Sequence, residues 1–147
     1  FSKACYREQK FDTDGERRFA VMLEDDSTVL KWMNPGPDQF VIEDRDGRRY
    51  QPDFVVETST EKLVVEPKSR GEMNDEAVRR KTEAAVLWCH IATDHHAKSY
   101  GGKPWRYVLV PDDRIGGNST LRGLLSEFTV PADMELLGRF DLAQALG

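Results

Sequence analysis

The chain reads Tyr50-Gln51-Pro52-Asp53-Phe54-Val55-Val56 and, after a short polar turn around Thr58-Ser59-Thr60, Leu63-Val64-Val65-Glu66-Pro67-Lys68. Both runs are typical of β-strands separated by a turn. Because a strand displays residues i and i+2 on the same face, Glu66 and Lys68 share a side and lie roughly 7 Å apart along the chain. The intervening Pro67 faces the other way.

Asp53 opens the first of these two strands, where pairing of the strands as a hairpin could bring it beside Glu66. Lys68 follows on the same face. Two carboxylates and one ammonium group that meet at the edge of a sheet form a small site for a hard divalent cation and an attacking water. The two strands therefore predict a cation-dependent hydrolytic site.

The remaining pattern alternates helices and strands. In chain order it predicts a helix that begins at Asp12-Thr13-Asp14-Gly15 and ends at Asp25-Asp26-Ser27, strands at 29–33 and 39–43, a hairpin turn at Asp46-Gly47, a long helix over about 75–93, a strand at 105–110 and a short helix at 121–128. The tail after Pro131 carries scattered apolar residues and is expected to dock as a final segment. This order predicts an α/β domain of two or three layers with a mixed sheet.

Length and composition favour one domain over residues 1–147, with 39% hydrophobic and 32% charged residues. No apolar run is long enough for a membrane span. Cys5 and Cys89 are far apart, which favours a reducing compartment such as the cytoplasm over a disulfide scaffold. Because the chain starts at Phe1, we expect it to be a segment of a longer polypeptide.

The formal net charge of −5 argues against strong autonomous binding to nucleic acid, since contacts with phosphates supply most of the non-specific affinity. Basic residues do cluster locally, and each cluster is equally consistent with a solvated face; the clusters are Arg45, Arg48 and Arg49, then Lys68 and Arg70, then Arg79, Arg80 and Lys81. If the domain acts on nucleic acid, another part of the protein is expected to hold the substrate.

Glu16 has two interpretations. In the first, Thr13-x-x-Glu16 is a capping box, with Glu16 reaching back to a free backbone amide at the helix start. In the second, Glu16 is a third acidic group of the site, because it shares the inward helical face of Phe19, Ala20 and Leu23.

Lys81 also has two interpretations. It interrupts the predicted inward stripe of the long helix, which reads Ala77, Lys81, Ala84, Ala85, Trp88, Ile91 and Ala92. A buried ammonium group must either extend to water or meet an anion. The candidate anions are Asp53, Glu66 and a bound phosphate, so we assign Lys81 to the site.

Pro67 removes a hydrogen-bond donor from its strand and is expected at an edge or a bend. This suits a strand that splays at its end and leaves the Pro67 carbonyl free. Lys68 at the strand end is either a surface lysine or the cation that offsets the repulsion between Asp53 and Glu66.

Three stretches taken together resemble a known family: residues 11–20, 50–56 and 64–68. They are similar to the PD-(D/E)xK nuclease superfamily, and in particular to the C-terminal endonuclease domain of type III restriction enzyme Res subunits and related superfamily 2 helicases. The motif reads Pro52-Asp53 and Glu66-Pro67-Lys68. Glu-Thr-Lys is the commoner form of its second half, so the chain departs at the variable position only. The similarity covers about residues 1–110.

The resemblance implies a restriction-endonuclease-like mixed sheet flanked by helices, and hydrolysis of DNA phosphodiester bonds with Mg²⁺, for which Mn²⁺ can substitute. It implies Asp53 and Glu66 as metal ligands, the Pro67 carbonyl as a further ligand, Glu16 as an accessory acid, and Lys68 as the group that orients or activates water. It also implies an ATP-dependent helicase domain upstream in the same polypeptide. Composition and periodicity show no such domain.

Two alternatives remain open from the residues. In the first, the chain is a non-catalytic module of the same fold that docks DNA or a protein. In the second, it is an ordinary α/β scaffold. In the scaffold, Asp53 and Lys68 form one ion pair, and Glu66 and Lys81 form another.

Overall fold

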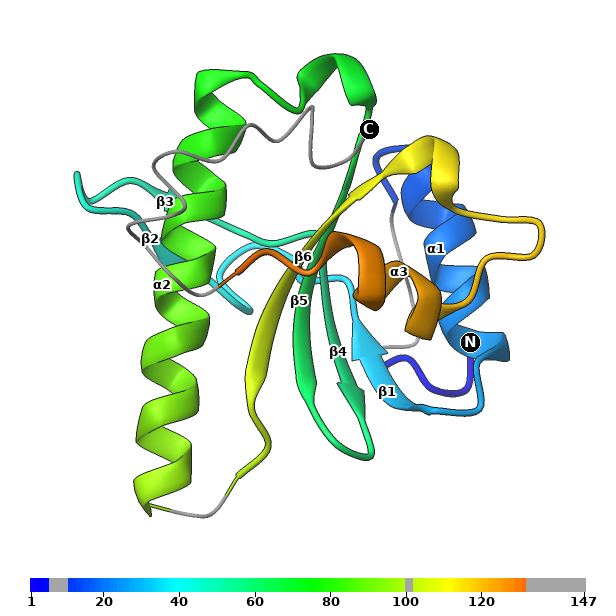
Figure 1. The fold of residues 1–147 in the computed structure, drawn as a ribbon, viewed down its shortest axis with the longest axis horizontal. Helices are drawn as coiled ribbons and strands as arrows, with labels where there is room; N and C mark the ends of the chain where they lie inside the picture. Colours follow the sequence, from blue (N-terminus) through cyan, green and yellow to red (C-terminus); the bar gives the residue numbers. More distant parts are fainter. Residues whose placement is uncertain (6–10, 100–101, 132–147) are drawn as a thin grey trace.

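The computed structural model describes residues 1–5, 11–99 and 102–131. In chain order the elements are α1 (Asp14–Asp25), β1 (Val29–Met33), β2 (Ile42–Glu43), β3 (Arg49–Tyr50), β4 (Phe54–Thr58), β5 (Lys62–Lys68), the 3-10 helix η1 (Arg70–Glu72), α2 (Glu76–Ser99), β6 (Trp105–Pro111), the 3-10 helix η2 (Asp112–Arg114) and α3 (Leu121–Phe128). Figure 1 shows their arrangement.

The main sheet has four strands in the order β1-β4-β5-β6, and a separate two-stranded hairpin joins β2 to β3. β1 and β4 are antiparallel, as are β4 and β5, whereas β5 and β6 are parallel. The connection between the parallel strands runs through α2, which spans the length of the sheet (Figure 1). The predicted mixed sheet of an α/β domain is therefore confirmed.

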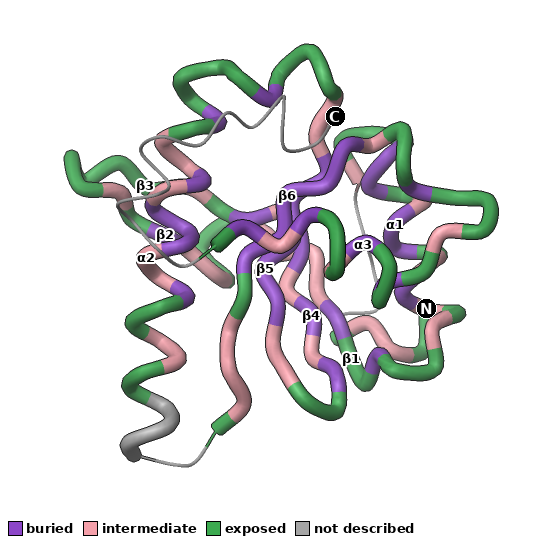
Figure 2. Tube along the Cα trace, viewed as in Figure 1, coloured by how far each residue is buried: buried purple, intermediate pink, exposed green. Residues whose placement is uncertain are grey.

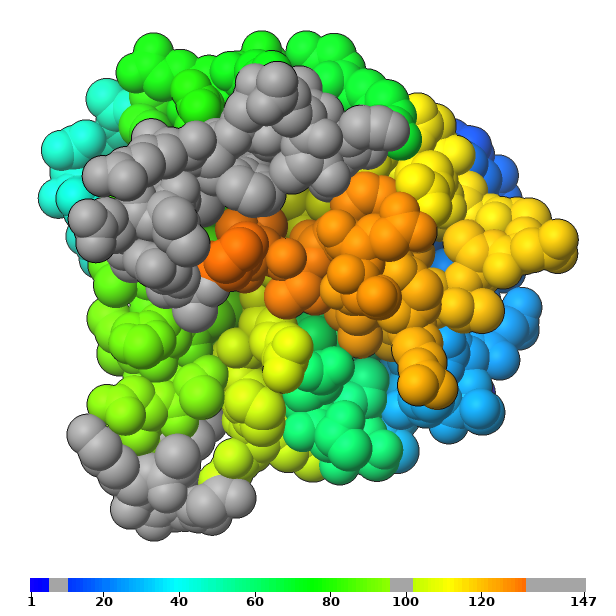
Figure 3. Space-filling model, viewed as in Figure 1, coloured from blue at the N-terminus to red at the C-terminus, as the bar shows by residue number. Residues whose placement is uncertain are grey.

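The helices form two outer layers around this sheet. α1 and α3 lie on one side and α2 lies on the other (Figure 1). Figure 2 shows that buried residues concentrate along β5 and β6, where both faces are covered. The space-filling view shows α3 in orange across the middle of the visible face (Figure 3).

On the α1 side, aromatic side chains make up much of the core. Phe19 of α1 packs edge-on against Phe54 of β4 with ring centroids 5.0 Å apart, and Trp32 of β1 lies 5.9 Å from the same ring. All three side chains are buried. Phe19 belongs to the predicted inward face of the first helix, so that face is confirmed together with the buried Glu16.

The turn between β4 and β5 is held by the buried hydroxyl of Thr58. Its Oγ1 accepts hydrogen bonds from the amides of Thr60 and Glu61 and donates one to the Glu61 carbonyl. The resulting register pairs Phe54 with Val65. The predicted hairpin and its turn are therefore confirmed, as is the turn at Asp46-Gly47, where Gly47 has a φ of 80° between β2 and β3.

Two predictions about elements were wrong. The strand expected over 39–43 is limited to Ile42–Glu43, because only these two residues pair with β3. In the long helix, Ala77 and Ile91 are exposed instead of inward, and Ile91 is 57% exposed. The side chains buried there include Val78, Thr82, Val86 and Cys89.

The alanines explain the second error, because Ala84 and Ala85 occupy adjacent stripes of α2 and both are buried. They do not indicate which stripe faces the sheet. The expected docking of the tail, with Met134, Leu136, Leu137, Phe140 and Leu142, lies outside the described residues.

Candidate active site

The hairpin of β4 and β5 brings Asp53 and Glu66 together. The last antiparallel pair is Phe54 with Val65, and continuing the register by one residue places Asp53 opposite Glu66. Side chains directly opposite each other in such a pair share one face of the sheet. Here it is the α2 face, because the neighbouring Phe54 packs on the α1 side against Phe19.

Both carboxyl groups are poorly hydrated. Glu66 is 4% exposed, and Asp53 is half-buried. Burial and, second, the carboxylate of Glu16 raise the pKa of Asp53 to about 7. Burial and, second, the carboxylate of Asp53 raise the pKa of Glu66 to about 8. The three acidic groups predicted for the site therefore influence one another directly.

Lys68 and Lys81 are the cations of this cluster. Each lowers the pKa values of Asp53 and Glu66 and so partly offsets the effect of burial. Neither lysine forms an ion pair with these carboxylates within the described part of the chain. The scaffold alternative, which requires the pairs Asp53–Lys68 and Glu66–Lys81, therefore lacks its defining contacts.

Glu16 caps its helix and also faces the site. Its amide donates to the Thr13 hydroxyl over 3.1 Å, and the Thr13 hydroxyl donates to Glu16 Oε2 over 3.2 Å. The carboxylate therefore contacts a hydroxyl, and among the described hydrogen bonds it accepts none from the Thr13 amide expected for a capping box. Burial is the largest influence on Glu16 and raises its pKa. The two interpretations of Glu16 are compatible, because one carboxylate oxygen remains outside the cap.

A cleft of about 470 Å³ opens beside Glu16 and Asp53. Its other lining residues are Asp12, Asn34, Pro35, Gly36, Pro37, Gln39, Gln51 and Pro52. The Asn34 amide group donates to the Asp53 carbonyl over 2.5 Å, which fixes the loop after β1 against the start of β4. Asp53 can therefore be reached from solvent through this cleft, whereas Glu66 is buried and does not line it.

Pro67 is not at an edge, because β5 lies between β4 and β6. It is buried and pairs in register with Val110 of β6. Of the two expected positions, an edge or a splayed strand end, the edge was wrong, whereas pairing with β4 does stop at Val65. From Glu66 to Lys68, β5 is paired on the β6 side only.

Three polar residues around Glu66 were missed by the sequence analysis. The Tyr50 hydroxyl donates to the Lys81 carbonyl over 2.9 Å, and the Lys81 ammonium lies 5.6 Å from the centre of the Tyr50 ring. Burial and the carboxylate of Glu66 raise the pKa of Tyr107. Thr82 lies beside Tyr107. Tyrosines in strands are usual core residues, so periodicity alone gave no signal for their role.

Unsatisfied polar atoms gather at the same place. Within the described residues, Glu66 Oε1, Tyr107 Oη and Thr82 Oγ1 are buried without a hydrogen-bond partner. Unpartnered buried groups are rare in native proteins and mark strain, catalysis or an absent water or ion. The inner end of the site thus leaves buried polar atoms that a water or an ion can contact.

The donor set suits a hard divalent cation. No three acidic, histidine or cysteine side chains of the described residues are grouped closely enough to enclose a metal by themselves. Mg²⁺ does not need such a cage, because it keeps several waters and binds through one or two carboxylates plus substrate phosphates. Asp53 and the unpartnered Oε1 of Glu66 fit this requirement.

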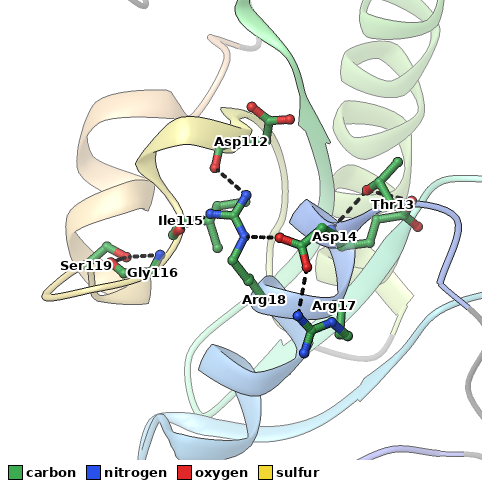
Figure 4. A network of polar contacts seen from close by, with 9 residues as sticks. Thr13, Asp14, Arg17, Arg18, Asp112, Ile115, Gly116 and Ser119 are labelled. Atoms are coloured by element: carbon green, nitrogen blue, oxygen red, sulfur yellow. Dashed lines mark hydrogen bonds and ion pairs between the residues drawn. The ribbon is translucent and has the colours of Figure 1, made fainter.

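A polar network fixes the helix that carries Glu16 (Figure 4). Arg18 Nη1 donates to the Ile115 carbonyl over 2.8 Å, and Arg18 Nε lies 3.0 Å from a carboxylate oxygen of Asp14. A Cβ on Gly15 would approach Asp112 Cβ to 3.0 Å, so the first turn of α1 lies tightly against η2. These contacts hold Glu16 in place at the mouth of the site.

Several residues of the predicted basic clusters form ion pairs. Arg70 pairs with Asp113 over 2.6 Å, and Arg45 pairs with Glu83 over 3.1 Å. Within the described residues these arginines are thus partly neutralised, which agrees with the solvated-face interpretation.

Comparison of the chain with protein-family models, curated proteins and solved structures finds no significant match. Among the described helices, none has the length and apolar character that crossing a bilayer requires.

Proposed function

We propose that this chain is a metal-dependent endonuclease domain that hydrolyses DNA phosphodiester bonds. The observation that carries the proposal is the placement of Asp53 opposite Glu66, one residue beyond the last pair of β4 with β5, with Lys68 following on the face of Glu66. This set matches the Pro52-Asp53 and Glu66-Pro67-Lys68 motif of the nucleases that the sequence resembles.

Asp53 and Glu66 would hold the cation, with Glu16 as an accessory acid and the Pro67 carbonyl as a further ligand. Mg²⁺, or Mn²⁺ in its place, would polarise the scissile phosphate and lower the pKa of a bound water. Burial serves this role because it makes the ionised carboxylates costly unless a cation compensates them.

Lys68 and Lys81 supply positive charge beside the carboxylates of Asp53 and Glu66. Lys68 orients the attacking water or stabilises the negative charge that develops on the phosphate. Lys81 contacts a neighbouring phosphate oxygen. Neither lysine is engaged in an ion pair with the site carboxylates among the described residues, so both ammonium groups are available to a substrate.

Binding of DNA is expected to depend on another part of a longer protein, because the net charge of the chain is −5. By the resemblance to type III restriction enzymes, that part is an ATP-dependent helicase domain in the same polypeptide. The chain then provides the cutting site rather than the main grip on DNA.

Nicking of supercoiled plasmid in Mg²⁺ and in Mn²⁺ tests the proposal. We expect Asp53→Asn, Glu66→Gln and Lys68→Ala to reduce the rate at least about 100-fold, because each removes a group of the reacting site. Lys62→Ala is the matched control, since Lys62 lies on the same face of β5 at its other end and should keep wild-type activity.

Cleavage that persists in the Asp53→Asn and Lys68→Ala variants would refute the assignment. Calorimetry with Mn²⁺ separates the docking alternative, because a non-catalytic module has no need to bind metal at Asp53 and Glu66. A folded wild-type chain that neither binds Mn²⁺ nor cleaves DNA would favour that alternative.

A further inference from the structure

The ammonium group of Lys81 requires a physical explanation for its position. It belongs to α2, is half-buried, and acts electrostatically on both Asp53 and Glu66. Yet it forms no ion pair with a described residue. A lysine stem has many rotamers and loses up to about 2 kcal/mol of conformational entropy when it is held in one of them, so some other contact must keep it at the site.

Tyr50 supplies that contact from the end of β3. Its ring lies beneath the ammonium, with Lys81 Nζ 5.6 Å from the ring centre, which is within the range of a cation–π interaction. Its hydroxyl donates to the backbone carbonyl of the same lysine over 2.9 Å. One side chain thus holds both the backbone and the charged end of Lys81.

Tyr50 is suited to this role over the whole accessible pH range. Burial, and second the carboxylate of Glu66, raise its pKa far above the ordinary value, so the phenol stays neutral and remains a donor. It is also the last residue of the hairpin of β2 and β3 and precedes Asp53 by three residues. The same short stretch of chain therefore sets the positions of Asp53 and of Lys81.

We infer that Tyr50 is a positioning residue that holds the Lys81 ammonium beside Asp53 and Glu66, where it can meet a phosphate oxygen of the substrate. This inference rests on the proposed nuclease function for its consequence, but not for the contact itself. A simple packing role for Tyr50, joining the hairpin to α2, is the alternative that the experiment must exclude.

The first measurement is a double-mutant cycle on plasmid nicking with Tyr50→Leu, Lys81→Gln and both changes together. We expect each single variant to lower kcat about tenfold with KM little changed, because a charge near the reacting phosphate is displaced. The double variant should be no slower than the slower single variant. Tyr50→Phe keeps the ring and should retain activity within about twofold of wild type.

Losses that multiply in the double variant would overturn the inference, because independent effects indicate that Tyr50 acts by packing. An equal loss in Tyr50→Phe would also overturn it, since the ring would then not be the holding contact. Circular dichroism of each variant must show a folded chain at the assay temperature.

The second measurement does not depend on activity. Lysines of the chain are reductively methylated with ¹³C and observed by NMR, and Lys81→Arg identifies the Lys81 resonance by its loss. We expect the Lys81 resonance to show an upfield ring-current shift in wild type and in Tyr50→Phe. This shift should be absent in Tyr50→Leu. Lys62, which lies 5.5 Å from the Trp105 ring, is an internal control whose shift should persist in all Tyr50 variants.

The two proposals fail in different ways. An unshifted Lys81 resonance in wild type overturns the positioning of Lys81, whatever the activity. A wild type that neither binds Mn²⁺ nor cleaves DNA in either metal refutes the nuclease proposal, and the NMR measurement then still decides whether Tyr50 holds Lys81.

Discussion

The carboxyl groups of Asp53 and Glu66, which the fold removes from water, make the free energy of unfolding depend on pH. The pKa values of Asp53 and Glu66 are 3.8 and 4.5 in the unfolded chain, and burial raises them to about 7 and about 8 in the folded chain. The folded state therefore binds more protons than the unfolded state between these values. Their stabilising contribution is complete below the unfolded pKa values of 3.8 and 4.5 and is lost as the pH rises from there through the folded values of about 7 and about 8.

We therefore expect the metal-free protein to be less stable at about pH 8 than at about pH 5. Urea unfolding at both values measures the difference, and Glu66→Gln should reduce it because the amide does not titrate. If the free energy of unfolding of the wild type rose over this range by more than that of the Glu66→Gln variant, the result would contradict the burial of the two groups.

Removing the buried hydroxyl of Tyr107 is expected to change the free energy of unfolding in the opposite direction from most core substitutions, which lower it. It has no hydrogen-bond partner among the described residues, so Tyr107→Phe removes an unsatisfied polar atom and leaves the ring in place. We expect the free energy of unfolding to stay constant or to rise by about 1 kcal/mol. Thermal unfolding measures it, and a loss of more than about 1 kcal/mol would mean that the hydroxyl is bonded after all.

At the same scale, the sequence pattern indicates the charged residues of the candidate site but gives no signal for residues whose role depends on contacts between distant elements. Asp53, Glu66 and Lys68 follow from alternation along two neighbouring strands. Tyr50 and Tyr107 read as ordinary strand aromatics, because their importance arises only when α2 crosses the sheet and meets them. Contacts between residues far apart in the chain are not encoded in local periodicity.

Among the elements, α1 has a polar connection to the rest of the fold through Arg18. Its guanidinium joins α1 to the segment between β6 and α3 through the carbonyls of Ile115 and Asp112, at 2.8 and 3.4 Å. We expect Arg18→Ala to lower stability by about 1–2 kcal/mol, because these carbonyls lose a charged donor. Arg17→Ala is the matched control, since Arg17 bonds only the exposed Asp14 among the described residues and should change stability by less than about 0.5 kcal/mol.

The Arg18→Ala variant also tests whether placement of α1 matters to the site. If the network positions Glu16, nicking activity should fall even at temperatures where the variant is fully folded. Equal stability of the Arg18 and Arg17 variants would contradict the structural importance of this contact.

The elements themselves were largely predictable where local chemistry is strong. The N-cap at Thr13, the turns and the motif strands each have a short-range cause. The rotation of α2 was not predictable, because its alanines fit two adjacent faces and only the packing of Val78, Val86 and Cys89 on the sheet selects one. The parallel placement of β6 beside β5 likewise results from the helical crossover.

For the whole molecule, a divalent cation should act as a stabilising ligand. A ligand that binds only the folded state raises its stability by about 2.7 kcal/mol at 100 times the dissociation constant. We expect Mn²⁺ to raise the melting temperature, and to do so more at about pH 8 than at about pH 5, because protons compete for the carboxylates at the lower pH. An unchanged melting temperature in wild type, or an equal rise in Asp53→Asn, would contradict a site at Asp53 and Glu66.

The overall charge predicts weak binding of DNA by the isolated chain. With a net charge of −5 and several arginines in ion pairs, few phosphates can be neutralised. Fluorescence anisotropy with a duplex should give a dissociation constant weaker than about 1 μM and a shallow dependence on salt. Tight binding with a steep salt slope would show that the chain grips DNA unaided.

The three-residue loop between β4 and β5, which the Thr58 hydroxyl holds in place, also determines which side chains lie at the far end of the hairpin. If β5 slid along β4 by a single position, each of its side chains would move to the opposite face of the sheet, because faces alternate along a strand. Glu66 and Lys68 would then point into the aromatic layer around Phe54, and the acid opposite Asp53 would be replaced by Val65 or Pro67. Lengthening or shortening this distant loop would thus dismantle the proposed site without altering any of its residues.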